Sequence, residues 1–183
     1  MSTKNKALFI QAILGGILIT VLLIPFQALT PYVSYTWMAF IPIILFFCLG
    51  VQCKLIPPMF LSYVCGAIWG IIFKYLADVM SAAGWSPALT FGILTTVIVF
   101  AILAVHPILL GKTPFGMAPI VLIGLVETIF TFLIQPANAP VIGSLQLIFF
   151  FAYGLALAFS LAQASGFFCR LFLGKDWTKS LEE

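Results

Sequence analysis

Charged residues are rare in this chain, and its Lys and Arg residues punctuate six long apolar runs. The runs cover residues 7–29, 35–51, 59–77, 88–110, 115–134 and 141–168. Each is close to the length of about 17–25 apolar residues that an α-helix needs to cross a bilayer. Because hydrocarbon cannot satisfy the backbone groups of an open strand, helices are the only open-chain structures that span it. The pattern predicts an all-α, polytopic membrane bundle of six transmembrane helices.

Composition excludes a soluble protein. Hydrophobic residues make up 63% of the chain and charged residues 7%, whereas a soluble domain carries about 25% charged residues. Too few polar side chains remain to cover a water-facing surface. The length of 183 residues favours one transmembrane domain over residues 1–183. The net charge of +3 comes from isolated basic residues rather than a cluster, so no nucleic acid is expected as a partner.

The basic residues predict the orientation of the bundle. With six crossings, all but one of the Lys and Arg residues fall on one side: Lys4, Lys6, Lys54, Lys112, Arg170, Lys175 and Lys179. Cytoplasmic loops are enriched in Lys and Arg, so both termini are expected in the cytoplasm and the protein in the inner (plasma) membrane. Lys74 lies on the other side, four residues before Asp78, which is the spacing of a helical ion pair.

The second to fifth runs contain an internal repeat. Pro57 aligns with Pro114, and in the same register Ile72-Phe73 aligns with Ile129-Phe130. Each half has an apolar helix, a short loop with one Lys, a Pro and a second apolar helix. A two-helix unit keeps its orientation in the bilayer, so this repeat is parallel, and transporter folds often place the substrate site between repeats. Chance similarity between apolar segments is the alternative.

Glu127 is the only acidic residue well inside an apolar run. It lies about twelve residues after Phe115, near the bilayer centre at 1.5 Å per residue. A charge at that depth costs at least about 2.5–3.5 kcal/mol by insertion scales, so Glu127 is expected to face protein or water and to be functional. When protonated it can donate to a carbonyl or a polar solute; when ionised it can bind a cation or exchange a proton. The alternative is a neutral Glu with a structural hydrogen bond between helices.

Three further polar side chains are candidates to line a narrow path with Glu127. Thr128 is its neighbour, and Gln11 and Gln163 lie at similar depths on the first and last runs. Together they are expected to form a substrate or proton site. The alternative for each is ordinary hydrogen bonding between helices, worth about 0.6 kcal/mol on average.

His106 is a pH-sensing candidate, because histidine titrates near physiological pH. Its alternative role is that of a polar residue at a helix end. The four cysteines show no CxxC spacing and no companion histidines, so neither a metal nor another cofactor is expected. No nucleotide-binding, HExxH or GxSxG motif occurs, and one Glu with one peripheral His does not supply a nucleophile with its base. The chain is therefore not expected to be an enzyme.

Small residues at four-residue spacing predict close helix packing. They are Ser62, Gly66 and Gly70 in the third run, Gly154, Ala158, Ala162 and Gly166 in the last, and a second face there of Ala152, Ala156, Ser160 and Ala164. Such faces let helix backbones approach closely. The last helix is therefore expected at the centre of the bundle or at a subunit interface. Because the bundle is small for a pore, a homo-oligomer is expected.

The segment WMAFIPIILFFCLG, the short loop with Lys54 and the helix with CGAIWG resemble the small YcdZ-like inner-membrane proteins of bacteria. The resemblance covers most of the second to fifth runs. It implies a bacterial multi-helix membrane protein of unassigned biochemical function, and it supplies no catalytic residue. The breaks LIPPMF and KTPFGMAP also resemble the Pro-Phe segments of urea channels, which implies small neutral solutes, although the full pattern of that family is absent.

Together these features predict a membrane channel or secondary transporter for a small solute, linked to protons through Glu127. Its partners would be the lipid bilayer and the solute. The alternative is a non-transporting membrane subunit or assembly protein of a larger complex, for which the small-residue faces would be partner contacts.

Overall fold

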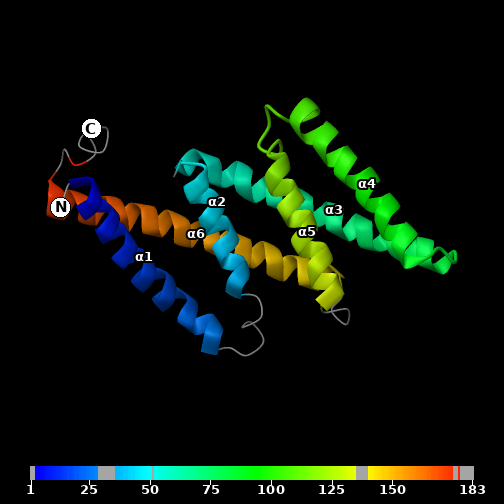
Figure 1. Cartoon of the computed structure of the whole chain (residues 1–183), viewed down its shortest axis with the longest axis horizontal. Coiled ribbons are helices and arrows are strands. Elements are labelled where there is room, and N and C mark those ends of the chain that lie inside the picture. Colours follow the sequence, from blue (N-terminus) through cyan, green and yellow to red (C-terminus); the bar gives the residue numbers. More distant parts are fainter. Residues whose placement is uncertain (1–2, 29–35, 51, 135–139, 175–176, 178–183) are drawn as a thin grey trace. The chain divides into compact units, whose positions relative to one another are not determined.

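The computed structural model describes residues 3–28, 36–50, 52–134, 140–174 and 177. These residues form helices and turns, with no strand among them. The α-helices of this described part are α1 (Thr3–Ala28), α2 (Phe40–Cys48), α3 (Ile56–Ala82), α4 (Pro87–Ala104), α5 (Ala118–Ile134) and α6 (Pro140–Leu173) (Figure 1). A 3₁₀ turn, Cys53–Leu55, precedes α3, and a π-helical turn, Val105–Leu109, continues α4. The all-α class and the six-helix count agree with the sequence-based prediction.

Helix length and composition are those of a membrane protein. Among the described residues, four helical segments are long and apolar enough to cross a membrane: Asn5–Ala28, Cys53–Ala82, Pro87–Leu109 and Gly143–Leu173. Two further apolar segments, Thr36–Cys48 and Ala118–Phe132, are shorter. The 9 residues of α2 extend about 14 Å at 1.5 Å per residue, against a hydrocarbon core of about 30 Å. The helix predicted over residues 35–51 is therefore shorter than expected. It ends before Gly50, which has a φ of 84°.

The third helix continues past its predicted end at residue 77. Asp78 remains helical and pairs with Lys74 one turn earlier, with its Oδ1 2.5 Å from Nζ. The helix ends at Ala82, and Gly84 follows with a φ of 83°. This left-handed conformation suits glycine and commonly ends a helix. The charged residue Asp78 was thus a poor marker of where the third helix ends.

Pro107 explains why α4 is not α-helical as far as residue 110. Proline has no backbone N–H, and its ring clashes with the carbonyl of the residue four positions earlier. The chain widens there into the π-helical turn, in which the Leu110 N–H donates to the Val105 carbonyl at 3.1 Å. Such turns are frequent at functional sites, and this one buries His106.

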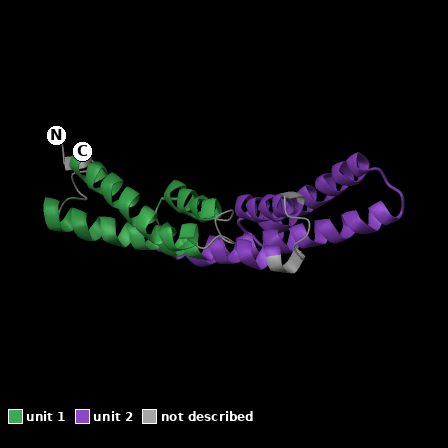
Figure 2. Ribbon diagram, turned by 90° about the horizontal axis from the view of Figure 1, so that it is seen from below, with its two compact units in different colours: residues 1–51, 153–183 green, residues 52–152 purple. Residues whose placement is uncertain are grey.

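The chain divides into two compact units (Figure 2). Unit 1 comprises residues 1–51 and 153–183, and unit 2 comprises residues 52–152, so that α6 contributes to both. In unit 1, α1 and α6 run antiparallel. The contacts follow that order along the pair: Leu22 with Tyr153, Gly15 with Leu161, and Ala7 with Cys169. The single transmembrane domain stays a prediction.

The small-residue face predicted on the last helix packs over only part of its length. In unit 1, Gly154 lies against Pro42, so that a Cβ at Gly154 would be 2.5 Å from the proline Cγ. Ala158 is fully buried, whereas Ala162 and Gly166 are half-buried. Nothing lies within 4 Å of a Cβ built at Gly166. The close contact therefore involves the N-terminal half of this face.

In unit 2, α3 and α5 approach each other closely. A Cβ at Gly66 would be 2.9 Å from the Cα of Gly124, and a Cβ at Gly70 would be 2.5 Å from the side chain of Thr128. Real Cβ atoms essentially never come so near to another atom, so both positions require glycine. The small residues of the third run therefore form the surface on which α5 packs.

Ser62 extends the same surface to the segment that leads into α5. Its hydroxyl donates to the Pro114 carbonyl at 3.2 Å and accepts from the Met117 N–H at 3.3 Å. A buried apolar cluster packs beside this contact, formed by Phe73, Leu94, Ile98, Ile102, Ala118, Val121 and Leu125. Hydrogen bonds and apolar packing thus hold the start of α5 on α3.

Gly66→Ala is expected to destabilise the protein by about 1–3 kcal/mol, the usual range for overpacking. The new methyl group would meet the backbone of α5, which cannot rotate away as a side chain can. Gly92→Ala on α4 is the matched control, because nothing lies within 4 Å of its Cβ position and alanine favours helix. The measurement is the thermal unfolding midpoint of the detergent-purified protein. Equal midpoints for the two variants would contradict the packing described here.

Candidate functional site

Glu127 lies in the middle of α5 with its side chain buried. Pro119 is in the first turn of the helix, where a missing N–H is tolerated, and apolar residues follow. The Glu127 side chain is 5% exposed. A buried carboxyl group is destabilising unless it is hydrogen-bonded or paired, so its partners determine what it can do.

Tyr63 of α3 is the hydrogen-bond partner of Glu127. Its hydroxyl donates to the Oε2 atom of the carboxyl group, and its side chain is fully buried. The ring of Phe151, on the part of α6 that belongs to unit 2, stacks on the Tyr63 ring with centroids 3.8 Å apart and planes 12° from parallel. The phenol is therefore held between the carboxyl group and an aromatic ring.

The other carboxyl oxygen of Glu127 has no such partner. Among the described residues, neither Oε1 of Glu127 nor the hydroxyl of Thr128 makes a hydrogen bond, and both atoms are buried. Leaving a buried polar group unsatisfied costs about 1–3 kcal/mol, and more when it is charged. Oε1 is therefore the atom at which a bound proton, cation or polar solute would lower the free energy most, because it would remove this cost.

Gln11 and Gln163 lie in unit 1, whereas Glu127 and Thr128 lie in unit 2. Gln11 is half-buried on α1, and Gln163 is exposed on α6. The antiparallel register of these two helices places them at similar levels, as expected. The structure thus places Glu127 against Tyr63 and Thr128 against Gly70, and a path shared by all four predicted residues stays a prediction.

Sequence reasoning missed Tyr63, because a tyrosine in an apolar run is usually a packing residue. The available signal was its position relative to the glycines of the same helix. Tyr63 lies three residues before Gly66 and seven before Gly70, which is the spacing of one helix face. The face already marked by glycines for contact with another helix also carried the donor that the buried acid needs.

His106 is buried, and both of its ring nitrogens have partners. Nδ1 is 2.6 Å from the Phe115 carbonyl, which can only accept, and Nε2 is 3.2 Å from the Trp69 indole N–H, which can only donate. These partners fit the neutral ring with its hydrogen on Nδ1. His106 therefore bridges α3 to the segment before α5. A proton on Nε2 would remove the acceptor for Trp69, and the pH-sensing role stays a prediction.

A metal centre is not apparent in the described ranges. They contain no group of three or more His, Cys, Asp or Glu side chains that could hold a metal ion. Cys48 and Cys53 are exposed, Cys65 is half-buried, Cys169 is buried, and all four are free thiols.

Tyr63→Phe keeps the aromatic ring against Phe151 but leaves the Glu127 carboxyl group without its donor. The unfolding free energy is expected to fall by about 1–3 kcal/mol. Combined with Glu127→Met, which removes the acceptor as well, the same change should cost much less, because no polar group is left unsatisfied. Denaturant unfolding of the wild type, both single variants and the double variant measures this coupling. Additive effects would show that the two groups do not interact.

His106→Asn is expected to destabilise the protein less than His106→Ala does. The asparagine amide can still donate to the Phe115 carbonyl, whereas alanine leaves that carbonyl and the Trp69 N–H unsatisfied, at about 1–3 kcal/mol for each buried group. Thermal midpoints in detergent test this order, with Trp69→Phe as the variant that removes the other partner. If both His106 variants lose the same stability, the bond to Phe115 contributes nothing.

Nothing matches the chain among protein-family models, curated proteins or solved structures. The resemblance to the YcdZ-like proteins therefore stays a prediction. The geometry around Glu127 is the basis for the function proposed below.

Proposed function

We propose that this protein is a secondary transporter for a small solute, coupled to protons through Glu127. The observation that carries the proposal is the buried carboxyl group, with one oxygen bound to Tyr63 and the other without a partner in the described residues. Ionisable residues inside membrane helices are rare, and they commonly mark ion or proton pathways.

The surroundings of Glu127 favour a carrier over a channel. A channel needs a continuous path, whereas a carrier closes over its site. The Glu127 side chain is 5% exposed. A carboxyl group buried in this way fits the closed state of a carrier that alternates between two openings.

Tyr63 would position the proton. Because its hydroxyl donates to Oε2, a proton on the carboxyl group sits at Oε1, where it removes a buried charge that has no other partner. Releasing that proton requires contact with water or solute at Oε1. Loading and release would therefore be tied to the opening of the contact between α3 and α5.

The internal repeat supports this location. In the alignment of Pro57 with Pro114, α3 and α5 are the corresponding helices, and the pair of Tyr63 and Glu127 lies at the contact between them. Transporter folds commonly place the substrate site at the interface between repeats. The site would thus be the junction of two related hairpins in one bundle.

The proposal includes the orientation predicted from charge. The protein would lie in a bacterial inner membrane with both termini in the cytoplasm, because Lys and Arg collect on that side. Exposed Trp85, in the turn between α3 and α4, would then lie at the outer interface, where tryptophan is enriched. A homo-oligomer would enlarge the small bundle around the path.

A non-transporting membrane subunit is the second candidate. It is favoured by the other small-residue face of α6, on which Ala156 and Ser160 are exposed. Such a face lets another helix approach closely. A stable partner that copurifies, in the absence of any solute flux, would support this function instead.

Flux into proteoliposomes tests the transporter. Vesicles loaded with a pH-sensitive dye are mixed with urea, glycine or glucose, and both swelling and internal pH are followed. At least one solute is expected to enter together with protons. Glu127→Gln is expected to abolish the proton signal, because an amide keeps the shape and the acceptor but cannot carry the proton.

Glu182→Gln is the control, because it neutralises an acidic residue far from Glu127 in the sequence and should leave flux unchanged. Circular dichroism and gel filtration establish that each variant is folded. The proposal fails if the wild type moves none of these solutes, or if folded Glu127→Gln still couples solute entry to protons.

A further inference from the structure

His106 joins three parts of unit 2. It belongs to the π-helical turn that ends α4. Its Nε2 atom accepts from the Trp69 indole N–H of α3 at 3.2 Å, and its Nδ1 atom is 2.6 Å from the Phe115 carbonyl in the segment that leads into α5. The chain connects α3 to α4 at the other end of α4, through the turn after Ala82. The His106 bridge therefore holds the two helices together where the chain does not.

Only the neutral ring of His106 can make both bonds. An indole N–H can only donate, and a carbonyl can only accept. A protonated imidazole carries a hydrogen on both nitrogens, so it would keep the bond to Phe115 and point a second donor at the Trp69 N–H. The bond to Phe115 would become charge-assisted, which is the stronger kind. Protonation would therefore break one side of the bridge and strengthen the other.

Burial makes the closed bridge still less compatible with a proton. The His106 side chain is 3% exposed, and a buried charge is costly unless it is paired or reaches water. Trp69 is half-buried, so its ring has an open side toward which it can move. Tryptophan is favoured where an apolar environment meets water, because its ring is apolar and its N–H is polar. Movement of Trp69 would let water reach Nε2.

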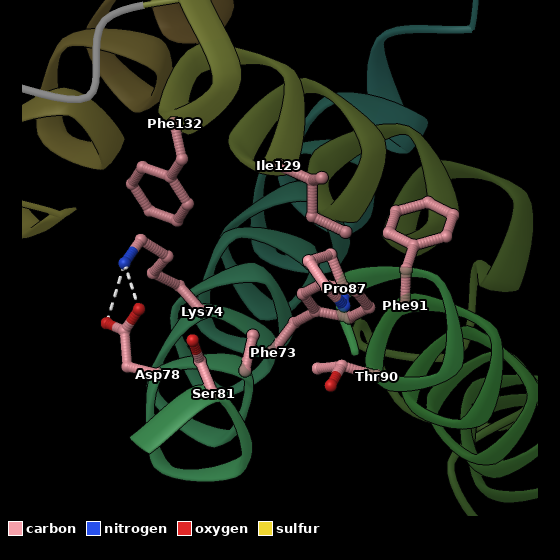
Figure 3. Close-up of a pocket in the computed structure, with 10 residues that line it drawn as sticks. Phe73, Lys74, Asp78, Ser81, Pro87, Thr90, Phe91, Ile129 and Phe132 are labelled. Carbon is pink, nitrogen blue, oxygen red and sulfur yellow. Dashed lines mark hydrogen bonds and ion pairs between the residues drawn. The ribbon is translucent and has the colours of Figure 1, made fainter. Parts of the chain in front are cut away.

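The acidic side chains of the neighbouring helices already have partners. On α5, Glu127 accepts from Tyr63, and on α3, Asp78 is paired with Lys74 (Figure 3). Neither of them is left to balance a charge on His106. The remaining titratable side chains of α3, α5 and the segment between α4 and α5 carry no negative charge at neutral pH: Cys65, Tyr75 and Lys112. A proton on His106 thus stays unbalanced while the bridge is closed.

A second bridge from α3 does not respond to pH. The Ser62 hydroxyl donates to the Pro114 carbonyl and accepts from the Met117 N–H, and a serine hydroxyl does not titrate near neutral pH. The start of α5 therefore stays attached to α3 when Trp69 is released. The change is confined to the contact between α3 and the end of α4.

We propose that the His106 bridge is an acid-triggered switch between α3 and the π-helical end of α4. At neutral pH the uncharged ring holds Trp69 and Phe115 together. On acidification His106 takes up a proton at Nε2, keeps its bond to Phe115 and releases Trp69. The switch does not depend on the role proposed for Glu127. In the orientation proposed above, it responds to the pH of the cytoplasm.

Nuclear magnetic resonance of the detergent-purified full chain, with ¹⁵N-labelled tryptophan, tests the switch. The indole N–H signal of Trp69 is assigned by its loss in Trp69→Phe. Between about pH 8 and pH 5 this signal is expected to shift along a one-proton curve, because histidine titrates in that range. In His106→Gln it should stay constant, because the amide oxygen can accept from Trp69 at every pH. The signal of exposed Trp85 is the internal control and should not titrate.

Thermal unfolding is the independent test. From about pH 8 to pH 5 the midpoint of the wild type is expected to fall by about 2–4 °C more than that of His106→Gln, the effect of losing about one hydrogen bond in a chain of this size. Trp69→Phe removes the donor, so its midpoint should depend less on pH than that of the wild type.

A Trp69 signal that does not move in the wild type overturns the switch, and so does one that moves equally in folded His106→Gln. If His106→Gln does not fold, Trp69→Phe decides. The same dependence of its midpoint on pH as in the wild type would overturn the proposal.

Discussion

The close approach of α3 and α5 is the contact on which the candidate site depends. Gly66 and Gly70 let the backbone and the Thr128 side chain of α5 lie where a Cβ would otherwise be. At that separation the Tyr63 hydroxyl reaches the Glu127 carboxyl group. The glycines contribute no chemistry, yet they determine whether the buried acid has a donor.

The nature of that donor determines what Glu127 can do. A lysine or arginine in place of Tyr63 would hold the carboxyl group in an ion pair and oppose its protonation. A phenol satisfies one oxygen without adding a charge. The second oxygen is left buried and without a described partner, so a proton bound there removes a buried charge. The bond from Tyr63 still holds the carboxyl group in place when the proton leaves. A purely structural carboxyl group is expected to have partners at both oxygens, so this combination supports the proposed carrier.

Sequence patterns predicted the features that depend on composition and missed those that depend on partners. Six apolar runs predicted six helices, and four-residue spacing predicted the glycine face of α3. Helix ends were less predictable: the third helix runs past Asp78 to Ala82, before Gly84 with its positive φ, and α2 covers 9 residues of its run. The role of Tyr63 was not predicted, because its partner lies on another helix and a local sequence pattern carries no information about such a contact.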